Sequence, residues 1–133
     1  NLEKAMLATD RFGGHIVSGH VVGVGHLIKV ENEGQSVKMT FKIPSNLSKY
    51  VAAKGSICVD GTSLTVNEAN DDYFAVNLIP HTQNETVSGS YQIGDSVNLE
   101  VDIIARYLER MNEGLNNKAN EITKGYLKDN GFG

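Results

Sequence analysis

Five polar side chains have the types and spacing for proton transfer and hydrogen bonding: His20, Lys54, Ser63, Thr65 and Asp102. A histidine and a carboxylate can each hold or move a proton near neutral pH. Hydroxyls at positions i and i+2 point to one face of a strand, and Ser63 and Thr65 have this spacing in an apolar run. The combination favours a ligand rich in nitrogen and oxygen atoms.

Each of these residues also has a plain structural interpretation. His20, next to a glycine, could be a loop histidine that bonds the backbone, and Lys54 could be a solvated loop lysine. Ser63 and Thr65 could belong to a solvent-exposed polar face. Asp102 ends an alternating run just before a helical pattern, where a carboxylate stabilises a helix N-terminus. The residues by themselves leave both interpretations open.

No metal or cofactor motif is recognised. His15 and His20 are five residues apart, which places them on opposite faces of a strand, and neither His26 nor His81 has a partner at zinc-ligand spacing. No nucleophile elbow or dinucleotide fingerprint is present. A single cysteine, Cys58, excludes an intramolecular disulfide and favours a reducing compartment. We therefore expect neither a metal site nor a cofactor.

Composition places the chain among ordinary single domains. It has 133 residues and a formal net charge of −4, which argues against nucleic acid or an anionic membrane as the main partner. No apolar run approaches the roughly 20 residues that a membrane helix needs. The N-terminus shows no signal-peptide pattern. A cytoplasmic location is the expectation that follows.

Hydrophobic periodicity predicts six short strands followed by a helical region. The strands are expected over 18–30, 37–43, 56–59, 63–67, 73–79 and 97–102. The first two should form a hairpin with a loop of four to five residues, and Asp60-Gly61 is a strong turn signal. Gly23 and Gly25 inside the first strand indicate a bulge or a close backbone approach.

Helical patterns cover shorter stretches. A helix over 46–52 with Ser45 as its cap, and a turn of helix over 82–86, are expected between strands. A helix is expected over 103–112, followed by a polar linker over 113–120 and a second helical segment over 122–128. Six strands with regular turns favour a closed antiparallel barrel of Greek-key type. The amphipathic terminal helix has no place inside so small a barrel, so we expect it to mediate oligomerisation.

Several motifs together resemble riboflavin synthase of the alpha-chain type. They are Asp10-Arg11-Phe12-Gly13-Gly14-His15-Ile16-Val17-Ser18-Gly19-His20-Val21, Lys54-Gly55-Ser56, Val59-Asp60-Gly61-Thr62-Ser63-Leu64-Thr65-Val66, Leu78-Ile79-Pro80-His81-Thr82 and Gly94-Asp95-Ser96-Val97-Asn98-Leu99-Glu100-Val101-Asp102. The family has two homologous six-stranded barrels and a C-terminal helix that builds a trimer. This chain resembles the second half: an inter-barrel lead-in over 1–14, the second lumazine-binding barrel over 15–102, and a helix with a tail over 103–133.

The resemblance implies a reaction and a site. The family dismutates two molecules of 6,7-dimethyl-8-ribityllumazine into riboflavin and a pyrimidinedione, without metal or organic cofactor, where a first barrel of one subunit meets a second barrel of another. A chain without the first barrel is expected to bind ligand and to lack turnover. The implied catalytic residues are His20, Asp102, Ser63 and Thr65; the implied substrate-binding residues are Gly19, His20, Val21, Lys54, Ser63, Leu64, Thr65, Ile79, Pro80, His81, Thr82, Gln83 and Asn84. The alternative is a non-catalytic flavin-binding or lumazine-binding protein of the lumazine-protein type.

Overall fold

The computed structural model describes residues 18–129, including their side chains except those of Val87 and residues 119–128. The expected lead-in over 1–14 and the side chain of His15 lie outside this part. The chain divides after Asp102 into two units, a β-barrel and a helix, and each is described by itself.

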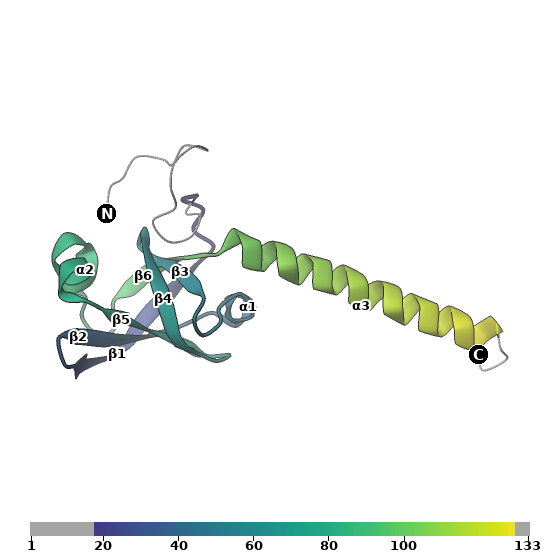
Figure 1. Ribbon diagram of the computed structural model, residues 1–133, viewed down its shortest axis with the longest axis horizontal. Helices are drawn as coiled ribbons and strands as arrows, with labels where there is room; N and C mark the ends of the chain where they lie inside the picture. Colours follow the sequence, from purple (N-terminus) through teal and green to yellow (C-terminus); the bar gives the residue numbers. More distant parts are fainter. Residues whose placement is uncertain (1–17, 130–133) are drawn as a thin grey trace. The chain divides into compact units, whose positions relative to one another are not determined.

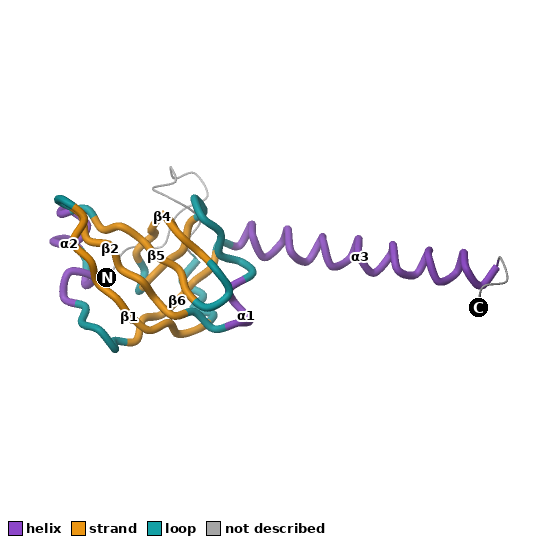
Figure 2. Tube along the Cα trace, turned by 90° about the horizontal axis from the view of Figure 1, so that it is seen from below, coloured by secondary structure: helices purple, strands orange, loops and turns teal. Residues whose placement is uncertain are grey.

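Six antiparallel strands close into a barrel, as the alternating pattern predicted. Their order around the barrel is β1-β2-β5-β4-β3-β6, with β6 pairing back onto β1 (Figure 1). Two short helices lie at opposite ends of this barrel, α1 and α2 (Figures 1 and 2). The strands are β1 (Gly23–Glu33), β2 (Ser36–Lys42), β3 (Ser56–Val59), β4 (Thr62–Ala69), β5 (Tyr73–Leu78) and β6 (Ser96–Val101); the helices between them are α1 (Ser45–Ser48), α2 (Pro80–Glu85) and the 3-10 turn η1 (Val87–Ser90).

Inward-facing apolar residues from every strand fill the barrel. Phe41 of β2 and Phe74 of β5 are register partners whose rings stack at 5.3 Å between centroids, and both are fully buried. Tyr91 closes the cluster with an edge-to-face contact on Phe41. Aromatic pairs of this geometry add attraction beyond the area that they bury. The core therefore centres on the β2–β5 pair, next to the strand that carries the predicted hydroxyls.

Two glycines of β1 allow close approach, as expected from their place inside a strand. A Cβ on Gly23 would lie 2.5 Å from Leu47 Cδ1 of α1. A Cβ on Gly25 would lie 3.0 Å from both the Lys42 carbonyl and Leu99 Cδ1. The bulge in β1 lies elsewhere, between Leu27 and Lys29.

The Asp60-Gly61 turn joins β3 to β4 as a two-residue hairpin, as predicted. Both residues have positive φ, 46° and 83°, which is the backbone that such tight hairpins require. The Asp60 carboxylate accepts hydrogen bonds from the Tyr91 hydroxyl at 2.5 Å and from the Asn98 backbone N–H at 2.7 Å. Burial raises the pKa of Tyr91, and the bond to Asp60 raises it further. The turn is thereby tied to β6 and to the core.

Three local predictions were wrong in their limits. Helix α1 ends at Ser48 rather than residue 52, and its N-cap is Pro44 with no side-chain cap from Ser45. Helix α2 begins two residues early because Pro80 is well suited to a first helical turn. The β1–β2 loop has two residues, since polar side chains on an outer face do not end a strand and Glu33 still pairs with Ser36.

The expected linker over 113–120 is also wrong, because one helix, α3 (Ile103–Asp129), runs through it. The polar composition of this stretch suggested a linker, and it contains a glycine, Gly114. A helix interrupted by a single glycine costs only about 1 kcal/mol relative to alanine, and the neighbouring Glu113, Leu115 and Lys118 are good helix formers. The apolar spacing is lost there because most of the side chains are polar, although the backbone remains helical. Of the helices in residues 18–129, none is both long and apolar enough to cross a membrane.

Candidate functional site

The predicted hydroxyls lie on the outer face of the barrel. Along β4, Leu64 and Val66 are buried, Ser63 is half-buried and Thr65 is exposed, which confirms the predicted alternation. On the neighbouring β5, the side chain of Asn77 is half-buried on the same outer side, because Val76 and Leu78 on either side of it are buried. The outer face of the β4–β5 pair therefore presents mostly polar groups.

Strands β4 and β5 are joined over only part of their length. Their register runs from Ala69↔Phe74 to Val66↔Val76. If the same register continued, Thr65 would face Asn77 and Ser63 would face Ile79. Instead β4 remains paired with β3 through Thr62, and β5 remains paired with β2 through Leu78. We call the stretch between these two diverging edges the β4–β5 seam: Thr62–Thr65 on one side and Asn77–Ile79 on the other.

Backbone direction makes the seam suitable for a flat polar ligand. The Val66 N–H donates to the Gly55 carbonyl at 2.9 Å, and the Val66 carbonyl accepts from the Lys54 N–H at 2.7 Å. Val66 therefore turns its peptide groups toward β3. Because backbone groups alternate sides along a strand, the peptide groups of Thr65 turn toward β5.

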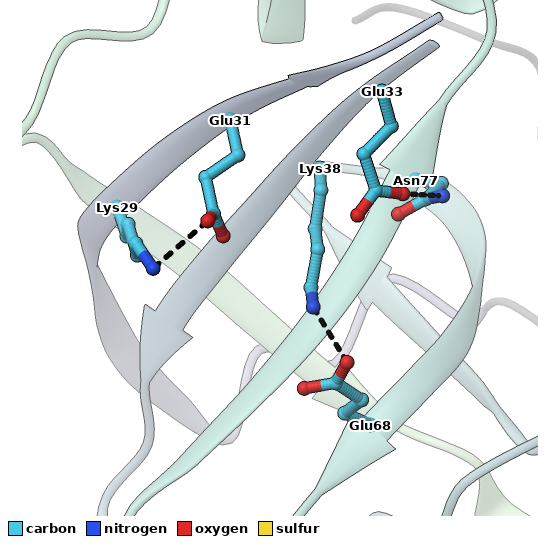
Figure 3. Close-up of polar contacts among 6 residues, drawn as sticks. All are labelled: Lys29, Glu31, Glu33, Lys38, Glu68 and Asn77. Carbon is cyan, nitrogen blue, oxygen red and sulfur yellow. Dashed lines mark hydrogen bonds and ion pairs between the residues drawn. The ribbon is translucent and has the colours of Figure 1, made fainter.

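Asn77 is a polar residue on the β5 side of the seam. Its Nδ2 donates to Glu33 Oε2 at 2.9 Å (Figure 3). Its Oδ1 is buried and has no hydrogen-bond partner among the described residues. A buried carbonyl oxygen left unpaired costs about 1–3 kcal/mol, so a bound N–H donor would recover that loss. Sequence reasoning missed Asn77, since an asparagine within a strand gives no local signal of a vacant acceptor.

An ion pair links β2 and β4 beside the seam. Lys38 Nζ of β2 lies 2.5 Å from Glu68 Oε1 of β4, across the intervening strand β5 (Figure 3). Ala75 of β5 is the register partner of Glu68, and its small side chain is fully buried. The hydrogen bond to Glu68 raises the pKa of Lys38. This pair spans the portion where β4 and β5 are joined.

Helix α2 follows β5 directly, one residue after Leu78. Ile79 is 56% exposed despite its large apolar side chain, and Pro80, His81 and Asn84 are also exposed. Thr82 and Gln83 are half-buried, and Gln83 Nε2 donates to the Leu78 carbonyl at 2.9 Å. The predicted segment from Ile79 to Asn84 thus lies at the end of β5, where it begins on the Asn77–Ile79 side of the seam.

A second polar cluster, which sequence reasoning missed, surrounds Glu100. This carboxylate is only 6% exposed. Its Oε1 accepts from the Ser18 N–H at 2.6 Å and the Ser18 hydroxyl at 3.0 Å, and its Oε2 accepts from the Gly19 N–H at 3.1 Å. The Ser18 hydroxyl also lies 3.0 Å from His20 Nδ1. No local pattern could indicate this, because the partners are 81 and 82 residues apart.

The sheet register relates the Glu100 cluster to the β4–β5 seam. Glu100 pairs with Cys58, and Cys58 pairs with Ser63, so only strand β3 separates the two. Adjacent strands are about 4.8 Å apart, which puts the backbones of Glu100 and Ser63 about 10 Å apart. Asp102 is half-buried one residue beyond the last β6–β3 pair, and exposed Lys54 lies just before the start of β3, where its N–H donates to the carbonyl of Val66 in the middle of β4. The predicted residues therefore do not all lie in one place. His20 belongs to the Glu100 cluster, and Ser63 and Thr65 belong to the seam on the other side of β3.

Cys58 lies between the groups as an inert thiol. It is 1% exposed, and burial raises its pKa to about 11, with the charge of Glu100 acting in the same direction. A rise from 9.0 to about 11 lowers the thiolate fraction about 100-fold near neutral pH.

We expect a chromogenic disulfide reagent at pH 8 to label the folded chain at least 100-fold more slowly than the urea-unfolded chain. Equal rates would contradict this assignment; the signal is specific because Cys58 is the only cysteine.

Comparison with known proteins decides the family. The lumazine binding domain family matches residues 18–102, the stretch from Ser18 to the end of the barrel. The chain belongs to this family. The resemblance drawn from the sequence motifs is thereby confirmed, as is the barrel fold.

Two relatives of this lumazine binding domain are named riboflavin synthase. The protein from Photobacterium phosphoreum is 45% identical over 99% of this chain and 62% of its own length. The protein from Bacillus subtilis (strain 168) is 43% identical over the same shares. The chain thus spans about 62% of the length of these relatives.

Solved structures share the barrel. LumP complexed with 6,7-dimethyl-8-(1'-D-ribityl) lumazine matches with a TM-score of 0.63 and 25% identity, covering 69% of this chain and 52% of LumP. LumP complexed with riboflavin matches with a TM-score of 0.64 and 25% identity, covering 69% of this chain and 50% of LumP.

Proposed function

We propose that the chain is the second barrel and terminal helix of a riboflavin synthase, and that its barrel binds 6,7-dimethyl-8-ribityllumazine at the β4–β5 seam. The observation that carries this is the seam itself, with outward hydroxyls, a backbone edge and the vacant Asn77 Oδ1. It occurs in a lumazine binding domain 45% identical to a protein named riboflavin synthase. The whole protein would transfer a four-carbon unit from one lumazine to a second, giving riboflavin and a pyrimidinedione.

The seam supplies complementary groups for such a ligand. Ser63 and Thr65 hydroxyls would bond ring or ribityl heteroatoms, and the Asn77 oxygen would accept from a ring N–H. The peptide groups of Thr65 and the backbone N–H of Ile79 would contact the ring edge, while the exposed Ile79 side chain and Leu64 would cover apolar ring surface. The remaining predicted contacts are Gly19, His20, Val21, Lys54, Pro80, His81, Thr82, Gln83 and Asn84.

The reaction needs proton loss from an acidified ring methyl and two ligands held face to face. His20 and Asp102 are the proposed groups for proton handling or orientation, because an imidazole and a carboxylate exchange protons readily at neutral pH. Holding both ligands together removes the entropy of their encounter. We propose that the facing surface is the first barrel of another subunit, within a cytoplasmic homotrimer.

Binding and turnover can be tested separately. Titrating 6,7-dimethyl-8-ribityllumazine into the chain should change the ligand fluorescence with a saturating, stoichiometric response. Mixing the same ligand with the two-barrel protein should produce riboflavin fluorescence over time. No fluorescence change in the first titration would overturn the binding proposal. Tight binding without riboflavin from the two-barrel protein would instead support the alternative of a non-catalytic lumazine-binding protein.

The terminal helix is proposed to assemble the trimer. Four large apolar side chains at helical spacing are 54–66% exposed: Ile104, Leu108, Met111 and Leu115. A stripe of this spacing on α3 is suited to pack against copies of itself.

We expect Leu108→Glu combined with Met111→Glu to convert the trimer to monomer in sedimentation velocity, as should removal of residues 103–133. Arg106→Gln with Arg110→Gln is the matched control and should remain trimeric; a trimer surviving the first pair would refute the role.

A further inference from the structure

The Glu100 cluster, formed by Glu100, Ser18, Gly19 and His20, contains one hydroxyl hydrogen that either of two neighbours could accept. The Ser18 hydroxyl has a single hydrogen, yet it lies 3.0 Å from Glu100 Oε1 and 3.0 Å from His20 Nδ1. An ionised carboxylate can only accept hydrogen bonds, whereas each imidazole nitrogen can donate or accept. The state of the histidine therefore depends on which neighbour receives the serine hydrogen.

Electrostatics favours the carboxylate. A hydrogen bond to an ionised acceptor is roughly twice as strong as one between neutral groups. Glu100 is 6% exposed, so water cannot replace the serine as its donor without loss. The Ser18 hydroxyl therefore donates to Glu100 and offers its lone pair to His20. Nδ1 must then carry the hydrogen of the neutral ring.

We propose that Ser18 and Glu100 are positioning residues that hold His20 as the Nδ1–H tautomer, so that Nε2 is the basic nitrogen presented to a bound lumazine. The tautomer follows from the hydrogen bonds alone; its use toward a ligand rests on the proposed function. Glu100 also holds the backbone just before His20 against β6, because its carboxylate accepts hydrogen bonds from the N–H groups of the two preceding residues. An outer partner that sets the tautomer and direction of a histidine decides which nitrogen can take a proton.

The chain contains a natural comparison. Ser96 Oγ lies 3.1 Å from His26 Nδ1, a serine–histidine pair of nearly the same length. In the described part of the chain, the hydrogen bonds of Ser96 include no carboxylate. The Ser96 hydroxyl can therefore donate its hydrogen to His26 Nδ1, so no carboxylate forces His26 into the Nδ1–H tautomer. The two pairs differ in the carboxylate behind the serine.

The tautomers are distinguished by long-range 1H–15N correlation on the 15N-labelled chain, recorded above the pH at which its histidines titrate. We expect a pyrrole-type nitrogen at Nδ1 of His20 and a pyridine-type nitrogen at Nε2. The opposite assignment at His20 would overturn the proposal. His26 should show the averaged shifts of two exchanging tautomers, or mainly the Nε2–H form common in free histidine.

Three variants separate tautomer control from general structure. Ser18→Ala removes the hydroxyl but leaves both backbone donors of Glu100, so His20 should shift toward Nε2–H while the barrel spectrum is unchanged. Ser18→Thr keeps a hydroxyl and should retain the Nδ1–H form. Ser96→Ala should change His26 and leave His20 as it is. An unaltered His20 tautomer in the Ser18→Ala chain would show that the serine does not set it.

Adding 6,7-dimethyl-8-ribityllumazine tests the second half of the proposal. Binding should shift Nε2 of His20 more than either nitrogen of His26. Binding that leaves Nε2 of His20 unchanged would overturn its role toward the ligand, with the proposed function intact. Absence of binding, with the Nδ1–H tautomer observed, would overturn the proposed function and that role together while supporting the assignment of the tautomer.

Discussion

Replacing Phe74 by alanine should lower the free energy of unfolding by about 3–5 kcal/mol, the usual cost of removing a large aromatic side chain from a core. Phe74 is fully buried, stacks on Phe41 at 5.3 Å and is its register partner. The cavity would open where β5 holds both β2 and β4. Because small domains have only about 5–15 kcal/mol in total, this single change should remove much of the stability.

Urea denaturation followed by circular dichroism measures the effect. Phe74→Leu keeps most of the volume and should cost clearly less than Phe74→Ala. Ile93→Ala is the control for lost apolar surface outside the core, since Ile93 is 68% exposed, and it should change stability by less than about 0.5 kcal/mol. A loss below about 1 kcal/mol for Phe74→Ala would contradict the packing described for the barrel.

Replacing Thr65 by valine should weaken lumazine binding about tenfold, equivalent to about 1.4 kcal/mol. The two side chains have nearly the same shape, so the change removes a hydroxyl from the seam without reshaping it. A ligand atom left without its partner in a dehydrated site costs about 1–3 kcal/mol. Thr65 is exposed, so the folded barrel itself should tolerate the change.

Fluorescence titration with 6,7-dimethyl-8-ribityllumazine gives the two affinities. Ser48→Ala is the matched control, because Ser48 is a hydroxyl of α1, at the opposite end of the barrel from α2 (Figure 1), and its Oγ bonds the Ser45 carbonyl at 3.0 Å. It should leave the affinity within about twofold, as expected for a surface change away from the ligand. Equal affinity of the Thr65→Val chain and the original would place the ligand elsewhere on the barrel.

Local patterns in the chain were sufficient for much of the fold. Alternation, β-branched residues and turn signals identified the six strands, and alternation put Ser63 and Thr65 on one face of β4. Asp60-Gly61 marked a hairpin because few residues adopt positive φ at both turn positions. These features depend on residues within a few positions of one another, so they can be recognised without knowing the fold.

Some predictions of where an element begins or ends were wrong because they relied on the polarity of single residues. Polar residues were taken to end the β1 strand and the α3 helix, although a polar residue on an exposed face is compatible with either element. Ser45 was expected to cap α1, but Pro44 occupies that position. Polarity reports the solvent around a side chain and only indirectly its backbone conformation.

The sequence by itself determined the strand pattern, the tight turn, the family and the two stretches around His20 and Ser63. Only the tertiary structure decided that β4 and β5 diverge beyond Val66, that Asn77 Oδ1 is a vacant acceptor, and that Glu100 holds Ser18 and Gly19. Each of these depends on groups brought together from distant positions by barrel closure. A strand pattern records which face a residue occupies, whereas hydrogen-bond partners across the barrel depend on register, which is set by the whole sheet.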